Sequence, residues 1–250
     1  MTTPDLPAAP RRAWAAQEAA ALLLREGIRR LPVDPAALLR ARGCRLLTYR
    51  QAARRLSAEA TAADIIDLYG TADAFTAVMP RTRQTLVVYN DEVDSGQRAA
   101  FSLCHELGHL QLGHFAYPEA ALTPAQRHLL DQEANVFAAN LLAPVAVVEQ
   151  LRRPFRATDR LLFSLSRQGW EVRLRTLDGD RAALPPPLLA AQREQFRAYM
   201  SQRRCPRCTA SFLRPIDICP ACGHALVWSP DACPMAFPWT PEAWRSAQQR

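Results

Sequence analysis

One short motif, Cys104-His105-Glu106-Leu107-Gly108-His109, limits the folds open to this chain more than any other feature. Histidines four residues apart lie about 40° apart on one face of an α-helix, so both imidazoles can bind a single metal ion. Glu106 lies beside them and is placed to take a proton from a metal-bound water rather than to bind the metal. The alternative is a chance motif whose histidines only make ordinary hydrogen bonds. Apolar residues would anchor this helix in a core: Phe101, Leu103, Leu107 and Leu110.

A catalytic zinc site needs a third protein ligand and one open position. No histidine follows at the short spacing that would supply it, which leaves the carboxylates Glu119, Asp131 and Glu133. Helix phase separates these carboxylates, because Glu133 shares a stripe with apolar residues whereas Asp131 is rotated from it by about 200° and should face water. A buried carboxylate needs a partner, and zinc would supply one. We therefore expect Glu133 to be the third ligand.

Hydrolysis of a peptide bond also needs a group that stabilises the developing oxyanion. Three side chains near the motif are candidates for this role or for contacts behind the metal ligands: His114, Tyr117 and His128. The sequence does not choose among them.

The remaining pattern predicts a mixed α+β domain in which helices accompany a small sheet. Helices are expected at residues 14–30, 34–39, 51–69, 96–112 and 124–142, and strands at 44–49, 74–79 and 85–89. Ser95 and Thr123 are natural caps for the last two helices. The runs Asp178-Gly179-Asp180 and Pro185-Pro186-Pro187 suggest a boundary. We therefore expect a catalytic domain at 13–180, a linker or helix at 181–203, a cysteine-rich module at 204–228 and a tail at 229–250.

The cysteine-rich module has the spacing of a zinc ribbon. Cys205-Pro-Arg-Cys208 and Cys219-Pro-Ala-Cys222 are separated by ten residues. Each pair can form a tight knuckle, and four thiolates complete a closed tetrahedral site. A redox dithiol is the alternative, but two matched pairs favour a structural zinc. The module could cap the fold, dock a protein, or bind nucleic acid through flanking arginines: Arg203, Arg204, Arg207 and Arg214.

The composition bears on the cellular compartment of the protein and on the partners it could bind. No apolar run approaches the roughly 18 to 20 residues that cross a bilayer, and the first twelve residues lack the features of a signal peptide. The chain is therefore expected to be cytoplasmic, with no membrane partner. The net charge is +7, but every basic residue is a scattered arginine, which favours a solvated surface over a nucleic-acid groove.

Two stretches resemble the ImmA/IrrE family of metallopeptidases. Residues 88–114 contain Val-Tyr-Asn, Gln-Arg and the run Phe-Ser-Leu-Cys-His-Glu-Leu-Gly-His-Leu-Gln-Leu-Gly-His, and residues 133–144 read Glu-Ala-Asn-Val-Phe-Ala-Ala-Asn-Leu-Leu-Ala-Pro. A weaker third match lies at 163–174. Ser102, Cys104 and Ala143 depart from the family's usual Thr, Ala and Met.

The resemblance implies a zincin-like fold, a catalytic zinc and endopeptidase activity, with Glu133 as the third ligand. It further implies a helix-turn-helix transcriptional repressor as substrate, cut to induce genes of a mobile element or a stress response. The alternative is a regulator that binds DNA or a transcription factor without cutting. The presence of Glu106 favours catalysis, because a binding protein needs no base beside a metal.

Overall fold

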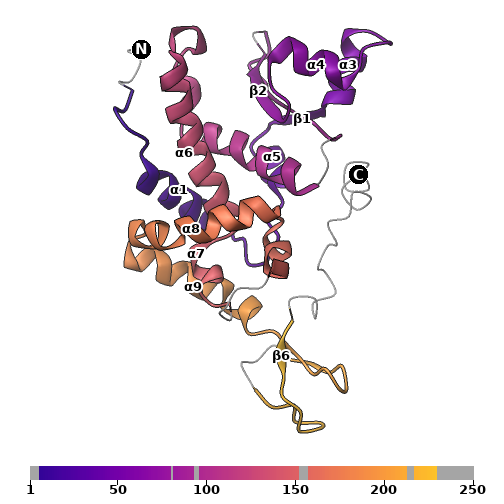
Figure 1. The fold of residues 1–250 in the computed structure, drawn as a ribbon, viewed down its shortest axis with the longest axis vertical. Helices are drawn as coiled ribbons and strands as arrows, with labels where there is room; N and C mark the ends of the chain where they lie inside the picture. The colour runs from indigo at the N-terminus through magenta and orange to yellow at the C-terminus, as the bar shows by residue number, and fades with distance from the viewer. Residues whose placement is uncertain (1–5, 80, 93–95, 152–156, 213–216, 230–250) are drawn as a thin grey trace.

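The computed structural model describes residues 6–79, 81–92, 96–151, 157–212 and 217–229 (Figure 1). The larger helices are α1 (Arg12–Arg25), α2 (Pro35–Ala41), α3 (Tyr49–Leu56), α4 (Ala62–Tyr69), α5 (Gly96–Gln111), α6 (Pro124–Leu142), α8 (Arg167–Ala183) and α9 (Pro186–Met200). Shorter helical segments are η1 (His114–Ala116), η2 (Glu119–Ala121), α7 (Val145–Val148) and η3 (Ala157–Phe163). The first sheet contains β1 (Arg45–Thr48), β2 (Ala74–Val78) and β3 (Thr85–Tyr89). The expected mixed α+β fold is confirmed.

The three strands form a sheet in the order β1-β3-β2. β1 runs parallel to β3 and β2 antiparallel to it, with Thr76 opposite Val87. Helices α3 and α4 close a small apolar cluster with the sheet, centred on Tyr49, Ile65 and Val88. Figure 1 shows this unit on one side of α5 and the larger group of helices on the other.

Local signals explain where the helices begin. Asp34 accepts a hydrogen bond from the backbone of Ala37 at the start of α2, and Thr123 forms a capping box with Gln126 at the start of α6. Gly70 ends α4 in the left-handed conformation (φ 67°), which a residue without a Cβ adopts at little cost. The expected cap Ser95 lies outside the described residues.

The main core is helical and extends past the boundary expected near residue 180. α8 continues through Asp178-Gly179-Asp180, because the Asp180 carboxylate is held by Arg173 and Asn140. α9 then packs into the same core through Phe196, and the Gln195 amide donates to the carbonyls of Leu23 and Ile28 at 2.7 and 2.6 Å. The segment expected as a linker or helix, 181–203, therefore contains the end of α8 and the whole of α9, and α9 packs into the helical core.

The cysteine-rich module follows α9 as a second small antiparallel sheet. Its strands are β4 (Arg203–Arg204), β5 (Ser211–Phe212) and β6 (Val227–Trp228), in the order β5-β4-β6. Trp228 joins this sheet to α9, since its indole N–H donates to the Tyr199 carbonyl at 3.3 Å and its ring packs edge-on against that of Tyr199. None of the helices in the described parts of the chain has the length and apolar character needed to span a bilayer.

Candidate metal centre

The metal centre is built where α5 and α6 pass close to one another. A Cβ added at Gly108 would lie 3.2 Å from both the Cα and the carbonyl oxygen of Ala134 and 3.1 Å from the Phe137 ring. Such distances are tighter than ordinary van der Waals contacts, so the glycine permits the approach. This close crossing brings the histidine face of α5 within reach of the side chains of α6.

Three donor atoms converge at this crossing. The Nε2 atoms of His105 and His109 lie 2.9 Å apart, and the Asp131 Oδ1 lies 3.9 and 3.4 Å from them. Ligands that each bind zinc at about 2.0–2.2 Å in tetrahedral geometry lie about 3.3–3.6 Å from one another. Two imidazoles and one carboxylate, with their metal-facing atoms within 4.8 Å, therefore fit such an ion.

Glu133 does not belong to this group, contrary to the sequence-based expectation. It is fully buried, as the helix phase predicts, but its partners are Arg11 and His114. Asp131 was expected to face water, and its side chain is half exposed. The same side of α6 also faces the two histidines, so Asp131 lies next to them. The geometry thus favours Asp131 over Glu133 as the third ligand.

Each histidine is held from behind by a second side chain. The Nδ1 of His105 lies 2.9 Å from the Asn135 amide oxygen, and the Nδ1 of His109 lies 2.9 Å from the Nδ1 of His114. Burial, followed by the charge of neighbouring His109, lowers the pKa of His105 to about 4. His105 is therefore neutral near pH 7, which is the state that binds a metal.

Glu106 faces the sheet rather than the metal ligands of α6. It is 8% exposed, and its Oε2 accepts a hydrogen bond of 2.7 Å from the Thr76 hydroxyl on β2. Burial raises the pKa of Glu106, while the charge of His109 and the Thr76 hydrogen bond oppose this rise. A raised carboxyl pKa suits a group that must both accept and donate a proton.

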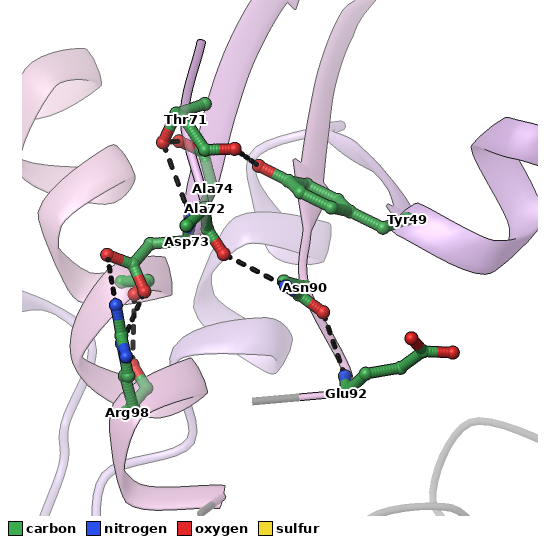
Figure 2. Close-up of polar contacts among 9 residues, drawn as sticks. Tyr49, Thr71, Ala72, Asp73, Ala74, Asn90, Glu92 and Arg98 are labelled. Carbon is green, nitrogen blue, oxygen red and sulfur yellow. Dashed lines mark hydrogen bonds and ion pairs between the residues drawn. The ribbon is translucent and has the colours of Figure 1, made fainter. Parts of the chain in front are cut away.

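The loop before β2 is fixed by a set of polar contacts (Figure 2). The Asn90 amide donates to the Ala72 carbonyl at 2.9 Å, and the Tyr49 hydroxyl donates to the Thr71 carbonyl at 3.0 Å. From α5, Arg98 donates to both carboxylate oxygens of Asp73, the shorter contact being 2.5 Å. The strand that carries Thr76 is thereby tied to β3, to α3 and to the helix that carries Glu106.

The three candidates for oxyanion stabilisation lie in different surroundings. Both ring nitrogens of His114 are engaged, by His109 and Glu133, which favours the role behind the ligands. Tyr117 is buried within electrostatic reach of Arg11, and His128 is exposed on α6 three residues before Asp131.

Sequence reasoning considered Asp131 but set it aside in favour of Glu133, and it did not single out Asn135 or Thr76. A usable signal was present for Asp131 and Asn135, because their spacing of four residues on one helix repeats the spacing of the two histidines. Thr76 carried no such signal, since its contact with Glu106 arises only from the packing of β2 on α5.

The four ribbon cysteines form a second cluster, all within 4.8 Å of one another. The Sγ atoms of Cys205 and Cys222 are 3.3 Å apart and those of Cys208 and Cys219 are 3.6 Å apart, close to the roughly 3.8 Å expected around tetrahedral zinc. Thr209 and Gly223, each just after a pair, adopt positive φ and donate to the carbonyl of the first cysteine of that pair. Hydrogen bonds, chiefly from the backbone of Cys208, lower the pKa of Cys205 to about 6 and so favour a thiolate.

Comparison with known families adds one finding. Residues 58–175 match the family described as Peptidase_M78, the IrrE N-terminal-like domain. The match contains the whole of α5 and α6, and hence every residue of the first candidate centre. No curated protein matches the chain.

Proposed function

Since residues 58–175 form a metallopeptidase domain of the M78, ImmA/IrrE family, we propose that this chain is a zinc-dependent endopeptidase with His105, His109 and Asp131 as its metal ligands. The observation that carries the ligand set is the convergence of two imidazole Nε2 atoms and one carboxylate oxygen at the α5–α6 crossing. Two histidines and one carboxylate leave a fourth position for water or substrate, as in other catalytic zinc sites.

A zinc ion held by His105, His109 and Asp131 would lower the pKa of a water molecule and would polarise the scissile carbonyl. Glu106 accepts the proton of the attacking water and passes it to the leaving amine. Thr76 holds one oxygen of Glu106 by its 2.7 Å hydrogen bond, leaving the other oxygen for proton transfer. Asn135 holds His105 in the orientation that turns its Nε2 toward the metal.

The ribbon cysteines are proposed to hold a second, structural zinc. Four ligands close that site and leave no position for a substrate. The exposed apolar side chains Ile218 and Val227 on this module favour docking of a protein. Contact with nucleic acid finds less support, since Arg203 donates to the carbonyls of Met200 and Gln202 rather than facing outward freely.

A peptidase acts on a protein, and we propose a helix-turn-helix transcriptional repressor as the substrate. This choice rests on the family resemblance and would place the protein in the induction of mobile-element or stress-response genes. The test is co-expression with candidate helix-turn-helix repressors from the same genome, each followed by a blot for fragments. Glu106→Gln is the matched control, because it keeps the shape of the side chain and the metal ligands.

A discrete fragment with the wild type and none with Glu106→Gln is the expected result. An intact partner that co-purifies with both proteins would overturn the peptidase assignment for this partner and support a regulator that binds without cutting. Metal content is measured in parallel, and Asp131→Ala should lose one zinc of two. Unchanged zinc in that variant would refute the ligand assignment.

A further inference from the structure

A continuous hydrogen-bonded chain runs from the N-terminal segment to a candidate metal ligand. Arg11, just before α1, donates three times to Glu133 of α6: from its backbone N to Oε1 (2.7 Å), from Nε to Oε1 (3.0 Å) and from Nη2 to Oε2 (2.8 Å). Glu133 Oε2 also lies 3.1 Å from the Nε2 of His114. The Nδ1 of His114 in turn lies 2.9 Å from the Nδ1 of His109.

The carboxylate of Glu133 determines which atom donates in each hydrogen bond from Glu133 to His109. An ionised carboxylate can only accept, so His114 must donate from Nε2. A neutral His114 then has only a lone pair at Nδ1, and His109 must donate from its own Nδ1. His109 is left with its lone pair on Nε2, the atom that faces His105 and Asp131. The hydrogen bonds that run from Glu133 through His114 thus select the tautomer of His109 that binds a metal through Nε2.

Burial makes this arrangement hard to replace by water. Glu133 is 0% exposed and His114 is 4% exposed. Arg11 is the cation that balances the buried carboxylate, and it is itself held over the Trp14 ring at 4.0 Å. Without Arg11, the buried carboxylate would lose its cation and its hydrogen-bond donors, which is a costly state that would loosen its hold on His114.

We propose that Arg11, Glu133 and His114 are positioning residues that fix His109 as an Nε2 ligand, so that seating of the N-terminal segment on α6 sets the metal affinity of the centre. The inference rests on the proposed function, because it requires a metal at His105, His109 and Asp131. In this inference Glu133 does not bind the metal directly. It acts on the ligand His109 through two successive hydrogen bonds.

The chain offers a close control for Arg11. Its neighbour Arg12 makes a similar contact to the neighbouring residue of α6, with its Nη2 3.0 Å from the Gln132 amide oxygen, but this contact leads to no metal ligand. The experiment loads full-length protein with Co²⁺ and measures affinity by competition with a chelator, together with the absorption spectrum of the bound ion. Bands from sulfur ligation separate the four-cysteine site from the nitrogen and oxygen site.

Arg11→Met and Glu133→Gln should each weaken Co²⁺ binding at the histidine site by about 10–100-fold and change its ligand-field spectrum. Arg12→Met should match the wild type, and Arg11→Lys should recover part of the affinity. Far-UV circular dichroism and an unchanged four-cysteine signal confirm that each variant is folded. A Glu133→Gln protein that fails this check is set aside, and Arg11→Met, a change at a partly exposed side chain, decides the matter.

The possible results distinguish a failure of this inference from a failure of the proposed function. Absent Co²⁺ binding at the histidine site of the wild type, or binding that survives Asp131→Ala, would overturn the metal assignment and the proposed function together. Binding that needs Asp131 but is equal in Arg11→Met, Glu133→Gln and Arg12→Met would overturn the positioning chain alone. An affinity loss with an unchanged spectrum would also count against it, because fixing the ligand tautomer is the effect proposed.

Discussion

At the scale of single residues, the contact between Thr76 and Glu106 makes the most direct prediction about pH. Thr76→Val removes a hydrogen bond to the ionised carboxylate, so the pKa of Glu106, already raised by burial, should rise further. A base must be ionised to act, so the acid limb of the activity profile should move to higher pH by about one unit. The measurement is kcat/KM against pH on the substrate identified by co-expression.

Thr85→Val is the control for this change, since it replaces a strand threonine opposite Val78, two positions along the ladder from Thr76. Its profile should overlay that of the wild type. If Thr76→Val lowers activity equally at every pH, Thr76 acts on substrate or folding and not on the ionisation of Glu106.

For Glu133, the sequence predicted the burial of the side chain but not the residue that pairs with it. The 3.6-residue period correctly predicted that its side chain is buried and needs a charged partner. The partner is Arg11, 122 residues away, whose approach depends on the packing of α1 on α6. No local pattern encodes that contact. The histidines and Glu106 were easier, because their geometry is contained within a single helix.

At the scale of secondary-structure elements, the crossing of α5 and α6 at Gly108 is the feature on which the centre depends. Gly108→Ala would push a methyl group against the Ala134 backbone. The strain should lower the free energy of unfolding by about 1–3 kcal/mol, partly offset by the better helix propensity of alanine. Because the ligands come from both helices, the metal affinity should fall as well.

Gly179→Ala in α8 provides the contrast, since no atom lies within 4 Å of an added Cβ there. That variant should be more stable than the wild type by up to about 1 kcal/mol. Chemical denaturation and chelator competition on both variants check the pair. Wild-type metal affinity in Gly108→Ala would show that the helix spacing is not limiting for the site.

The same α8 shows how tertiary contacts can outweigh a local turn signal in the sequence. Asp, Gly and Asp in a row are typical of a turn. In the fold, Asp180 meets the buried guanidinium of Arg173 and the amide of Asn140, and these tertiary contacts outweigh the local preference. The strands and the capped helices α2 and α6 were predicted within a few residues, since apolar periodicity and caps are local signals. The segment 51–69, expected to be helical throughout, is instead divided into α3 and α4.

At the scale of the whole molecule, α9 connects two candidate metal sites of different kinds. The cysteine-rich module is too short to build a sufficient apolar core, so its fold should depend on bound metal. The histidine centre depends instead on the packing of long helices into one core. Trp228 links the two through its contacts with Tyr199, and Arg203 adds a hydrogen bond to the Met200 carbonyl.

This arrangement predicts that the two metals are lost independently. Cys205→Ser leaves three thiolates in the ribbon, so one zinc per chain should be lost while the helical content and the second zinc remain. Asp131→Ala should give the reverse pattern, retaining the thiolate-bound ion, and the double variant should bind neither. Zinc analysis of the purified chains by mass spectrometry, with Co²⁺ spectra to identify the ion that remains, measures each case. Loss of both ions from Cys205→Ser alone would mean that the ribbon supports the helical core through α9, and the two sites would then be one cooperative unit.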